Sequence, residues 1–257
     1  MIYVGTSGYS YKDWIGPFYP EDVKQGDMLS IYSGAFDFTE INSTYYRLPN
    51  AFMFYNMQKK TGDAFKFTVK LHQAMTHSRD ASPADYRTFL DSVKVLKEAN
   101  KLGCLVAQFP YSFHCDPGNR DYLKALKEQL EGYELVVEFR NNKWINDSTF
   151  ELLKENELGF VCVDEPSLYG LLDRKALSTS KISYVRLHGR NSRKWWEHEE
   201  AYERYDYLYK ESELAEWVEK VEKLAEDCED CFVSFNNHYK AQAVSNAMLL
   251  KKLLGLE

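Results

Sequence analysis

Apolar residues fall along this chain in two alternating patterns, which predict strands and helices in turn. Short segments rich in Val, Ile, Phe and Tyr are apolar almost throughout, which is typical of strands buried on both faces of a parallel sheet. They lie near residues 2–6, 38–42, 66–72, 103–109, 135–140, 159–165, 183–188 and 231–237. Strand followed by helix, repeated about eight times over about 250 residues, predicts an α/β fold of the (β/α)8 TIM-barrel type, with an open doubly wound sheet as the alternative.

The segments between these strands carry helix signals. Several begin with a capping residue, two of them followed by proline at the first helical position, and continue with apolar residues at helical spacing. The predicted helices start at Ser82-Pro83, at Asp116-Pro117, at Asn146 or Asp147, before the apolar seam of Leu214 to Leu224, and near Lys240, the last ending at Gly255. No linker, repeat or low-complexity stretch interrupts the pattern. We therefore expect a single domain over residues 1–257, with long loops at the carboxyl-end face.

Composition places the chain among ordinary globular proteins. It has 257 residues, of which 44% are hydrophobic and 28% charged, enough to bury a sizeable core. No apolar run approaches the roughly 20 residues of a membrane-spanning helix, and the first residues lack a secretory signal. The 5 cysteines are odd in number and scattered, as reduced thiols in the cytosol would be. We expect a cytoplasmic protein with no membrane partner.

The net charge of −7 is unevenly distributed. Residues 197–230 carry 14 acidic and 4 basic residues, so the rest of the chain has a small positive balance. Most of this acidity lies in or just before one predicted helix, where it is typical of a solvated outer face. The overall acidity therefore does not exclude an anionic ligand or a nucleic acid.

Polar side chains gather on one parity of the predicted strands, towards their carboxyl ends. Because side chains alternate along a strand, residues two apart share a face. This parity contains Glu40, Asn42, Thr68, Lys70, His72, Gln108, Glu138, Arg140, Cys162, Asp164, Arg186, His188, Ser234 and Asn236. The opposite parity is mostly apolar. Charged residues are rarely buried unless paired, so the pattern predicts a polar pocket at the carboxyl-end face. The alternative is an ion-pair network that merely fills the barrel.

The residue types in this set point to acid–base chemistry on an anion. Carboxylates beside fixed cations stay ionised and act as bases, histidine titrates near neutrality, and arginine forks suit phosphate or carboxylate. We expect catalytic roles, with Glu138 and Asp164 as bases and His188 as acid or proton shuttle, for Glu40, Glu138, Asp164 and His188. We expect binding roles, with the first three holding the anion, for Lys70, Arg140, Arg186, Asn42, His72, Gln108, Asn236, Asn237, Tyr9, Trp14, Tyr46, Trp144 and Trp195.

Several of these binding residues are aromatic and follow predicted strands, where they would rim the pocket. Such rings stack on nucleobases or sugars while neighbouring bases hold phosphates. Half of them are expected instead to pack loops onto the barrel. The favoured ligand is a small phosphorylated or nucleotide-like molecule, and the reaction would be that of a hydrolase, lyase or isomerase.

Other functions fit parts of the pattern. The histidines and carboxylates could converge on a metal ion, but the nearby cations disfavour it, so the cofactor stays open. Cys228 and Cys231 have redox-type spacing without a second cysteine pair, and we interpret that spacing as coincidence. A non-catalytic interaction protein that recruits a partner through its acidic helix is a further alternative.

A nucleic-acid-binding module, or a nuclease-like protein, is the main alternative. After the seventh predicted strand, basic residues alternate with indoles: Arg190, Arg193, Lys194, Trp195 and Trp196. Such a mixture is typical of surfaces that hold single strands. The sequence does not indicate an oligomeric state.

Ordered motifs along the chain resemble one known family. The first runs from Gly5 to Ser10 with Trp14 and Phe18-Tyr19-Pro20, and the second from Glu40 to Tyr46 and on to Pro49. The series continues with Glu138-Phe139-Arg140 and Trp144, Asp164-Glu165-Pro166, Arg186-Leu187-His188-Gly189 and Phe235-Asn236-Asn237. The chain therefore resembles, over nearly its whole length, the YecE-like family, also known as domain of unknown function 72. The resemblance implies a fold similar to a TIM barrel, and it implies no activity, because none is established for that family.

Overall fold

Eight parallel strands close into a barrel in the order of the sequence, so the (β/α)8 prediction is confirmed. The computed structural model describes residues 1–256. The first strand pairs with both the second and the eighth, which excludes the open sheet. Each predicted strand lies within two residues of its observed bounds. The strands are β1 (Ile2–Ser7), β2 (Phe38–Ile41), β3 (Lys66–Lys70), β4 (Leu102–Gln108), β5 (Leu135–Glu138), β6 (Leu158–Asp164), β7 (Ile182–Leu187) and β8 (Asp230–Phe235).

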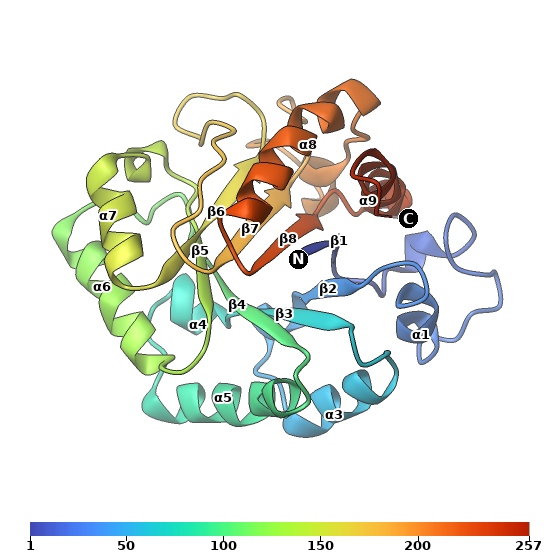
Figure 1. Ribbon diagram of the computed structural model, residues 1–257, viewed down its shortest axis with the longest axis horizontal. Helices are drawn as coiled ribbons and strands as arrows, with labels where there is room; N and C mark the ends of the chain where they lie inside the picture. Colours follow the sequence, from blue (N-terminus) through green and yellow to red (C-terminus); the bar gives the residue numbers. More distant parts are fainter. Residues whose placement is uncertain (257) are drawn as a thin grey trace.

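Helices surround the barrel (Figure 1). The α-helices are α1 (Met28–Tyr32), α2 (Ser43–Tyr46), α3 (Ala51–Lys59), α4 (Gln73–Thr76), α5 (Pro83–Glu98), α6 (Pro117–Gln129), α7 (Asp147–Glu155), α8 (Glu211–Glu226) and α9 (Gln242–Leu253). Short 3-10 turns are η1 (Lys12–Trp14), η2 (Asn142–Trp144), η3 (Ala201–Tyr205) and η4 (Tyr239–Ala241). The capping signals hold: Ser82 forms a capping box with Asp85, Asp116 caps α6, and Asn146, rather than Asp147, caps α7.

Two connections differ from the predicted alternation of strand and helix. The segment from β6 to β7 contains no helix within the described residues. A groove of about 630 Å³ lies there instead, between α7 and α8, with Lys154, Lys220 and Lys223 among its lining residues. The last helix begins at Gln242 instead of Lys240, because Lys240 and Ala241 adopt positive φ angles and interrupt the helical path.

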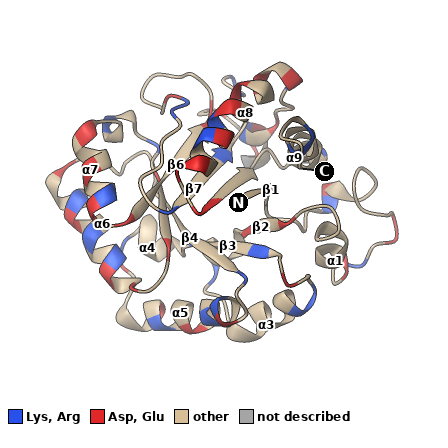
Figure 2. Cartoon of the chain, viewed as in Figure 1, with Lys and Arg blue, Asp and Glu red and all other residues tan. Residues whose placement is uncertain are grey.

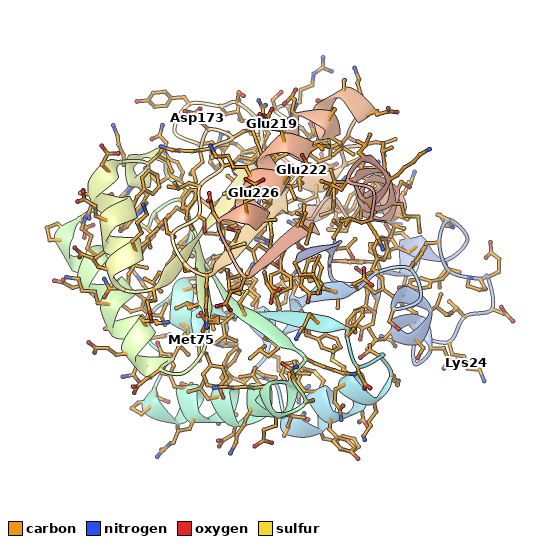
Figure 3. All side chains as sticks on the ribbon, viewed as in Figure 1. Lys24, Met75, Asp173, Glu219, Glu222 and Glu226 are labelled. Atoms are coloured by element: carbon orange, nitrogen blue, oxygen red, sulfur yellow. The ribbon has the colours of Figure 1, made fainter. Side chains whose placement is uncertain are left out.

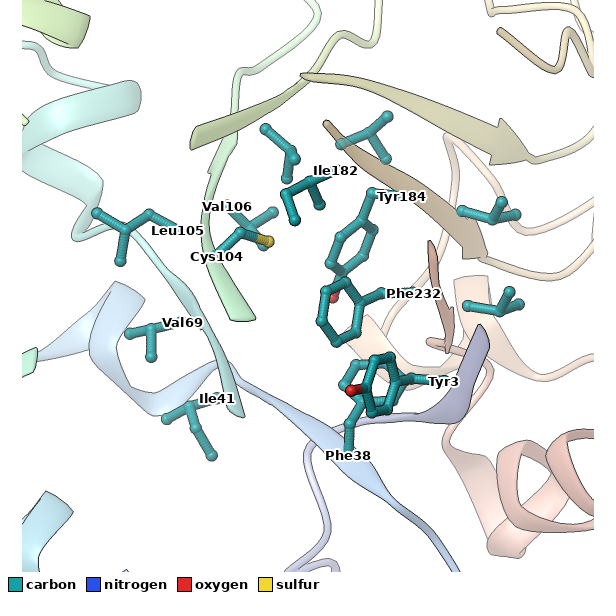
Figure 4. Close-up of a cluster of buried hydrophobic side chains, with 14 of the residues drawn as sticks. Tyr3, Phe38, Ile41, Val69, Cys104, Leu105, Val106, Ile182, Tyr184 and Phe232 are labelled. Carbon is teal, nitrogen blue, oxygen red and sulfur yellow. The ribbon is translucent and has the colours of Figure 1, made fainter. Parts of the chain in front are cut away.

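The barrel interior is apolar at one end and polar at the other. Figure 4 shows the rings of Tyr3, Phe38, Tyr184 and Phe232 gathered around the axis, with Cys104 beside them. Tyr3 and Phe232 stack with their ring centroids 4.9 Å apart. These side chains close the end of the barrel that lies away from the strands' carboxyl ends, so any opening to the interior lies at the opposite, polar end.

The acidic helix α8 lies on the outside of the molecule, as predicted for a solvated face (Figures 2 and 3). Glu219, Glu222 and Glu226 are exposed, whereas the seam of Leu214, Trp217, Val221 and Leu224 is buried. Its acidity therefore does not describe the charge of the barrel interior. Within residues 1–256, no helix combines the length and apolar character that crossing a membrane requires.

Candidate functional site

The polar parity of β2, β5 and β7 faces the barrel axis, as predicted. Arg186 on β7 bonds carboxylates on β2 and β5, strands that do not neighbour β7, so the three side chains meet inside the barrel. Arg186 Nη1 donates to Glu138 Oε2 at 2.5 Å, and Nη2 donates to Glu40 Oε1 at 2.7 Å. The Tyr184 hydroxyl donates to the other oxygen of Glu40 at 2.9 Å. All four side chains are almost fully buried.

Arg140 extends this cluster towards solvent. Its Nε lies 2.7 Å from Glu138 Oε1, and its Nη1 donates to Glu165 Oε2 at 2.9 Å. The Arg140 side chain is 11% exposed, whereas both carboxylates are inaccessible. We call Glu40, Glu138, Arg140, Glu165, Tyr184 and Arg186 the floor network. An ion-pair network therefore fills this layer of the barrel.

The charges of the floor network stabilise one another. Burial alone raises the pKa of a carboxyl group, but Arg140 and Arg186 hold the pKa of Glu138 well below its usual value. Conversely, Glu138 and Glu40 raise the pKa of Arg186 despite its burial. Glu138 therefore stays a carboxylate bound to two guanidinium groups. It is fully buried behind them, and the prediction that it lines the pocket as a base is not supported by this geometry.

Glu165 belongs to the site, although we assigned it no role from the sequence. Its Oε1 accepts a hydrogen bond from the backbone amide of Leu172 at 3.0 Å, and Arg140 binds the other oxygen. Burial outweighs the attraction of Arg140 and raises the pKa of Glu165 to about 7. This carboxyl group therefore exchanges its proton near neutrality.

His188 lies beside the floor network but lines neither chamber, and it is not a cationic acid. Its Nε2 lies 3.1 Å from Arg140 Nη2 and 3.2 Å from Glu138 Oε1, and its Nδ1 lies 3.1 Å from the Asn236 amide nitrogen. Burial, reinforced by Arg140, lowers the pKa of His188 to about 3. The expected proton-donating imidazolium is therefore absent near pH 7, and His188 holds Arg140 and Asn236 in place.

Two adjoining chambers lie above the floor network, at the carboxyl ends of the strands. The inner chamber, about 220 Å³, is lined by Tyr11, Asn42, Tyr45, Tyr46, Lys70, Gln108, Arg140, Arg186, Tyr205, Asn236 and His238. The outer chamber, about 300 Å³, is lined by Tyr45, Tyr46, Lys70, His77, Gln108, Pro110, Tyr111, Arg140, Leu171, Trp195, Trp196, Arg204 and Tyr205. Of the residues predicted to bind substrate, Lys70, Arg140, Arg186, Asn42, Gln108, Asn236, Tyr46 and Trp195 meet in these chambers.

The chamber walls are cationic. Lys70, Arg140, Arg186 and Arg204 line them, whereas no Asp or Glu does so among the described residues. Arg186 Nε and Asn42 Oδ1 are buried without a hydrogen-bond partner in the described part of the chain, which leaves one donor and one acceptor unsatisfied in residues that line the inner chamber. The carboxylates of the floor network thus lie behind their arginines, and the surface offered to a ligand is positive.

The sequence analysis placed Asp164 on the wrong face of β6. It pairs in register with Leu187 and faces the helices, not the barrel axis. Trp217 Nε1 of α8 donates to its Oδ2 at 2.7 Å, Arg190 Nη2 donates to the same oxygen at 2.7 Å, and the Tyr209 hydroxyl donates to Oδ1 at 3.0 Å. The prediction of Asp164 as a base in the pocket is therefore wrong, and its bonds tie α8 and the loop after β7 to the barrel.

Three other predicted binding residues have structural roles. Trp14 and Trp144 are fully buried, and their indole N–H groups donate to the carbonyls of His238 and Phe113. Asn237 is also buried and donates to backbone and side-chain oxygens beside α9. None of the three lines a chamber, so their assignment to the pocket is corrected.

His72 and Tyr9 lie next to the chambers but outside them. The chain turns away from the barrel after β3, and His72 caps α4 by accepting from the Ala74 amide. Tyr9 lines a separate side cavity of about 520 Å³, which Glu40 also lines and which shares Asn42 with the inner chamber. His72 therefore takes no part in the described pocket, and Tyr9 contributes only to its neighbour.

Loop residues that the sequence analysis did not assign complete the outer chamber. His77 follows α4, and Tyr205 and Arg204 end η3. Arg204 lies over Trp195, 5.5 Å from the ring centroid, and Arg140 lies 5.7 Å from the same ring. Loops carry no periodicity, so the only available signal was the density of bases and aromatics after β7.

Most other basic residues of that loop form salt bridges with carboxylates. Arg190 bonds Asp164, Glu213 and Glu216, and Lys194 lies 3.1 Å from Glu203. The nucleic-acid alternative, which relied on Arg190, Arg193 and Lys194, thus has fewer free cations than the sequence indicated. For a metal, no group of three or more His, Cys, Asp or Glu side chains with suitable geometry occurs within residues 1–256.

Comparisons with known proteins agree on one family. The model of the family described as "Protein of unknown function DUF72" matches residues 3–257. The chain is 31% identical to "UPF0759 protein YunF" of Bacillus subtilis (strain 168), with 100% of this chain and 96% of the relative covered. A crystal structure of a DUF72 family protein (TM1631) from Thermotoga maritima MSB8 superposes with a TM-score of 0.92 at 42% identity, with 99% of each chain covered. Another, of EF0366 from Enterococcus faecalis V583, superposes with a TM-score of 0.89 at 25% identity, covering 100% of this chain and 96% of that one.

Proposed function

The chain belongs to the DUF72 family of proteins of unknown function, and we propose that it is an enzyme that binds a small, phosphate-bearing anion in the two chambers. One observation carries this proposal. The chamber walls contain four cationic side chains and, among the described residues, no carboxylate. The carboxylates that pair with Arg140 and Arg186 lie behind the walls. Cationic groups that face a concave site attract an anion and hold it with charge-assisted hydrogen bonds.

Arg140, Arg204 and, in its protonated form, Lys70 are the anion-holding groups in this proposal. All three line the outer chamber, and within residues 1–256 neither Lys70 nor Arg204 has a salt bridge. Arg186 is different, because Glu40 and Glu138 bind its two terminal nitrogens, while its buried Nε has no hydrogen-bond partner among the described residues. Arg186 therefore supports the floor and contributes one donor to the inner chamber.

Aromatic side chains favour a ligand with a planar part. Tyr45, Tyr46, Trp195, Trp196 and Tyr205 surround the outer chamber, and such rings stack on nucleobases. Three of them belong to the β7–α8 connection, and in TIM barrels phosphate sites are frequent after strands 7 and 8. The position after strand 7 is only an analogy with other TIM barrels, so it supports a nucleotide-like ligand only in combination with the cationic chamber walls.

Catalysis, not binding alone, is supported by a titratable group that lines both chambers. Removal from water and the nearby Arg186 lower the pKa of Lys70 to about 7. A group poised near neutrality in a cleft is typical of acid–base sites. We propose that Lys70 takes over the proton transfers that the sequence analysis assigned to Asp164 and His188.

Isothermal titration calorimetry with inorganic phosphate, adenosine and adenosine monophosphate tests the binding step. We expect the monophosphate to bind more tightly than either fragment, and Arg204→Met to weaken it by about 1.5–3 kcal/mol, the range for hydrogen bonds to charged groups. Arg193→Met is the matched control, since Arg193 is an exposed arginine of the same loop outside both chambers. If the two variants bind alike, or no phosphate compound binds to the wild type, the proposal is wrong.

A further inference from the structure

Among the described residues, Lys70 is the one basic side chain that lines both chambers and has no carboxylate partner. It ends β3 and lines both chambers, so its amine is accessible to a ligand in either. The arginines of the floor network are held by carboxylates, whereas Nζ of Lys70 donates to the neutral amide oxygen of Gln108 at 2.8 Å. The Tyr45 ring lies against it, with its centroid 4.5 Å from Nζ.

The surroundings of Lys70 favour an uncharged amine. Removal from water and the positive charge of Arg186 both disfavour the ammonium form, which Glu40 and Glu138 only partly offset. The titratable and charged groups facing it from the neighbouring elements are Glu40, Tyr45, His77, Glu138, Arg140 and Arg186. An amine that is unprotonated near neutrality is a nucleophile, whereas an ordinary surface lysine is not.

We propose that Lys70 forms a Schiff base with the carbonyl carbon of a phosphate-bearing aldehyde or ketone. This inference rests on the proposed function, because Arg140 and Arg204 would hold the substrate's phosphate in the outer chamber beside the amine. The inference identifies the substrate class, a phosphorylated aldehyde or ketone, which the cationic walls alone do not identify. The geometry that carries it is an amine without a carboxylate partner, at the junction of two chambers.

The covalent step is balanced without an added oxidant or reductant. The Nζ lone pair forms a bond to the carbonyl carbon, and the carbonyl π pair moves to oxygen, which takes a proton that leaves nitrogen. The resulting carbinolamine loses its hydroxyl as water together with the remaining proton of the nitrogen, while the nitrogen lone pair forms the C=N bond and the pair of the broken N–H bond stays on nitrogen. His77 lines the same chamber and adds no positive charge to it, because burial lowers its pKa to about 4.

Lys101 provides an internal control for the effect of burial alone. It is 3% exposed, and burial lowers the pKa of its amine as well. Its Nζ donates to the carbonyls of Gln58 and Thr61 and to the Thr61 hydroxyl at 2.7–3.0 Å. Because Lys101 lines none of the described chambers, it should remain unmodified if access to the chambers is what matters.

The test traps the imine on the full-length protein. The protein is incubated with glyceraldehyde 3-phosphate or with glyceraldehyde, reduced with borohydride, and analysed by intact mass and peptide mapping. We expect one equivalent of label on Lys70 with the phosphorylated aldehyde and at least tenfold slower labelling without the phosphate. The rate should rise about tenfold per pH unit below pH 7 and level off above it. Lys70→Arg keeps a cation in place and should abolish the label, and circular dichroism checks that the variant is folded.

Parallel calorimetry with adenosine monophosphate separates this inference from the proposed function. Phosphate binding that depends on Arg204, with labelling spread over surface lysines or equal at Lys101, would overturn the Schiff base and leave the anion site standing. Selective labelling of Lys70 by both aldehydes at equal rates, without phosphate binding, would overturn the anion site and leave the nucleophile. Loss of both results would overturn both proposals.

Discussion

The floor network and the outer chamber contain the same kinds of cation but differ in what surrounds them. In the floor network, Arg186 is almost fully buried and bonds two carboxylates. In the outer chamber, Lys70 and Arg204 face a cavity that no carboxylate lines among the described residues. The first arrangement pairs its own charges, so removing one partner would leave the other buried and uncompensated, while the second leaves charge for a ligand. The same residue type at a strand end thus has a structural or a functional role according to its partners.

Replacing Arg186 should have the largest effect on the free energy of unfolding. Arg186→Met leaves Glu40 and Glu138 buried without their shared cation, and removing one partner of a buried pair costs about 3–5 kcal/mol. Urea unfolding of the variant measures this loss. Arg204→Met is the matched control from the chamber wall and should change stability by less than about 1 kcal/mol. Equal losses in the two variants would remove the distinction between floor and chamber.

The next largest effect concerns Glu165 and the pH dependence of stability. Its folded-state pKa of about 7 lies above the ordinary value of 4.5, so the folded protein binds more protons than the unfolded chain between these pH values. Stability contributed by this group is therefore present at low pH and falls as pH rises from 4.5 to 7, by about 3 kcal/mol for the full shift.

Glu165→Gln should remove that fall, because the amide keeps an acceptor for Leu172 and carries no proton to lose. The measurement is the difference in unfolding free energy between wild type and variant at a series of pH values. Lys70 acts in the opposite sense above pH 7, since its lowered pKa makes stability rise with pH there. A difference that stays constant between pH 4.5 and 7 would show that Glu165 is ionised throughout.

Arg140 belongs to both the floor network and the chamber walls. It bonds Glu138 and Glu165 behind the wall, yet its side chain is 11% exposed and lines both chambers. Arg140→Lys keeps the charge but cannot bridge two carboxylates, so we expect both stability and adenosine monophosphate affinity to fall, each by about 1–2 kcal/mol. Urea unfolding and calorimetry on one preparation give both values. A loss in only one of them would assign Arg140 wholly to the floor or wholly to the ligand.

The sequence predicted the barrel and most of its interior but placed one strand wrongly. Towards the carboxyl ends of β2, β5 and β7, charged residues stand on one parity and apolar residues on the other, so alternation identified Glu40, Glu138 and Arg186 as inward. β6 is apolar on both parities, and only its register with β7 shows that Val161 and Val163 face inward and Asp164 outward. Alternation cannot orient a strand buried on both faces, which is why a lone charged residue at its end was misassigned.

The loops limited the prediction of the site for a different reason. Arg204 and His77 reach the outer chamber from connections without strand or helix periodicity, so no spacing rule located them. Trp14 and Trp144 follow the first and fifth strands in sequence but are buried, because an indole needs only one acceptor to be satisfied in the core. The salt bridges could not be predicted either, since the sequence does not show which carboxylate binds which cation.

The smallest expected effect separates a small ligand from a polymer. A single strand of nucleic acid that entered the chambers would also place phosphates near Arg193 and Lys194, and its affinity would fall with salt by a log–log slope of roughly −0.7 for each phosphate contacted. A ligand held only by Lys70, Arg140 and Arg204 does not reach that part of the loop.

Replacing Arg193 and Lys194 together by alanine should therefore change adenosine monophosphate affinity by less than about 0.5 kcal/mol, as for other surface changes away from a site. Fluorescence anisotropy with a labelled oligonucleotide, measured from low to physiological salt, gives the affinity for a polymer and its salt dependence. Since Lys194 already pairs with Glu203 and the acidic residues 197–203 lie in the same connection, we expect weak oligonucleotide binding with a slope that the double variant leaves unchanged. A steep slope that flattens in the double variant would establish a polymer as the ligand and make the outer chamber one part of a longer binding surface.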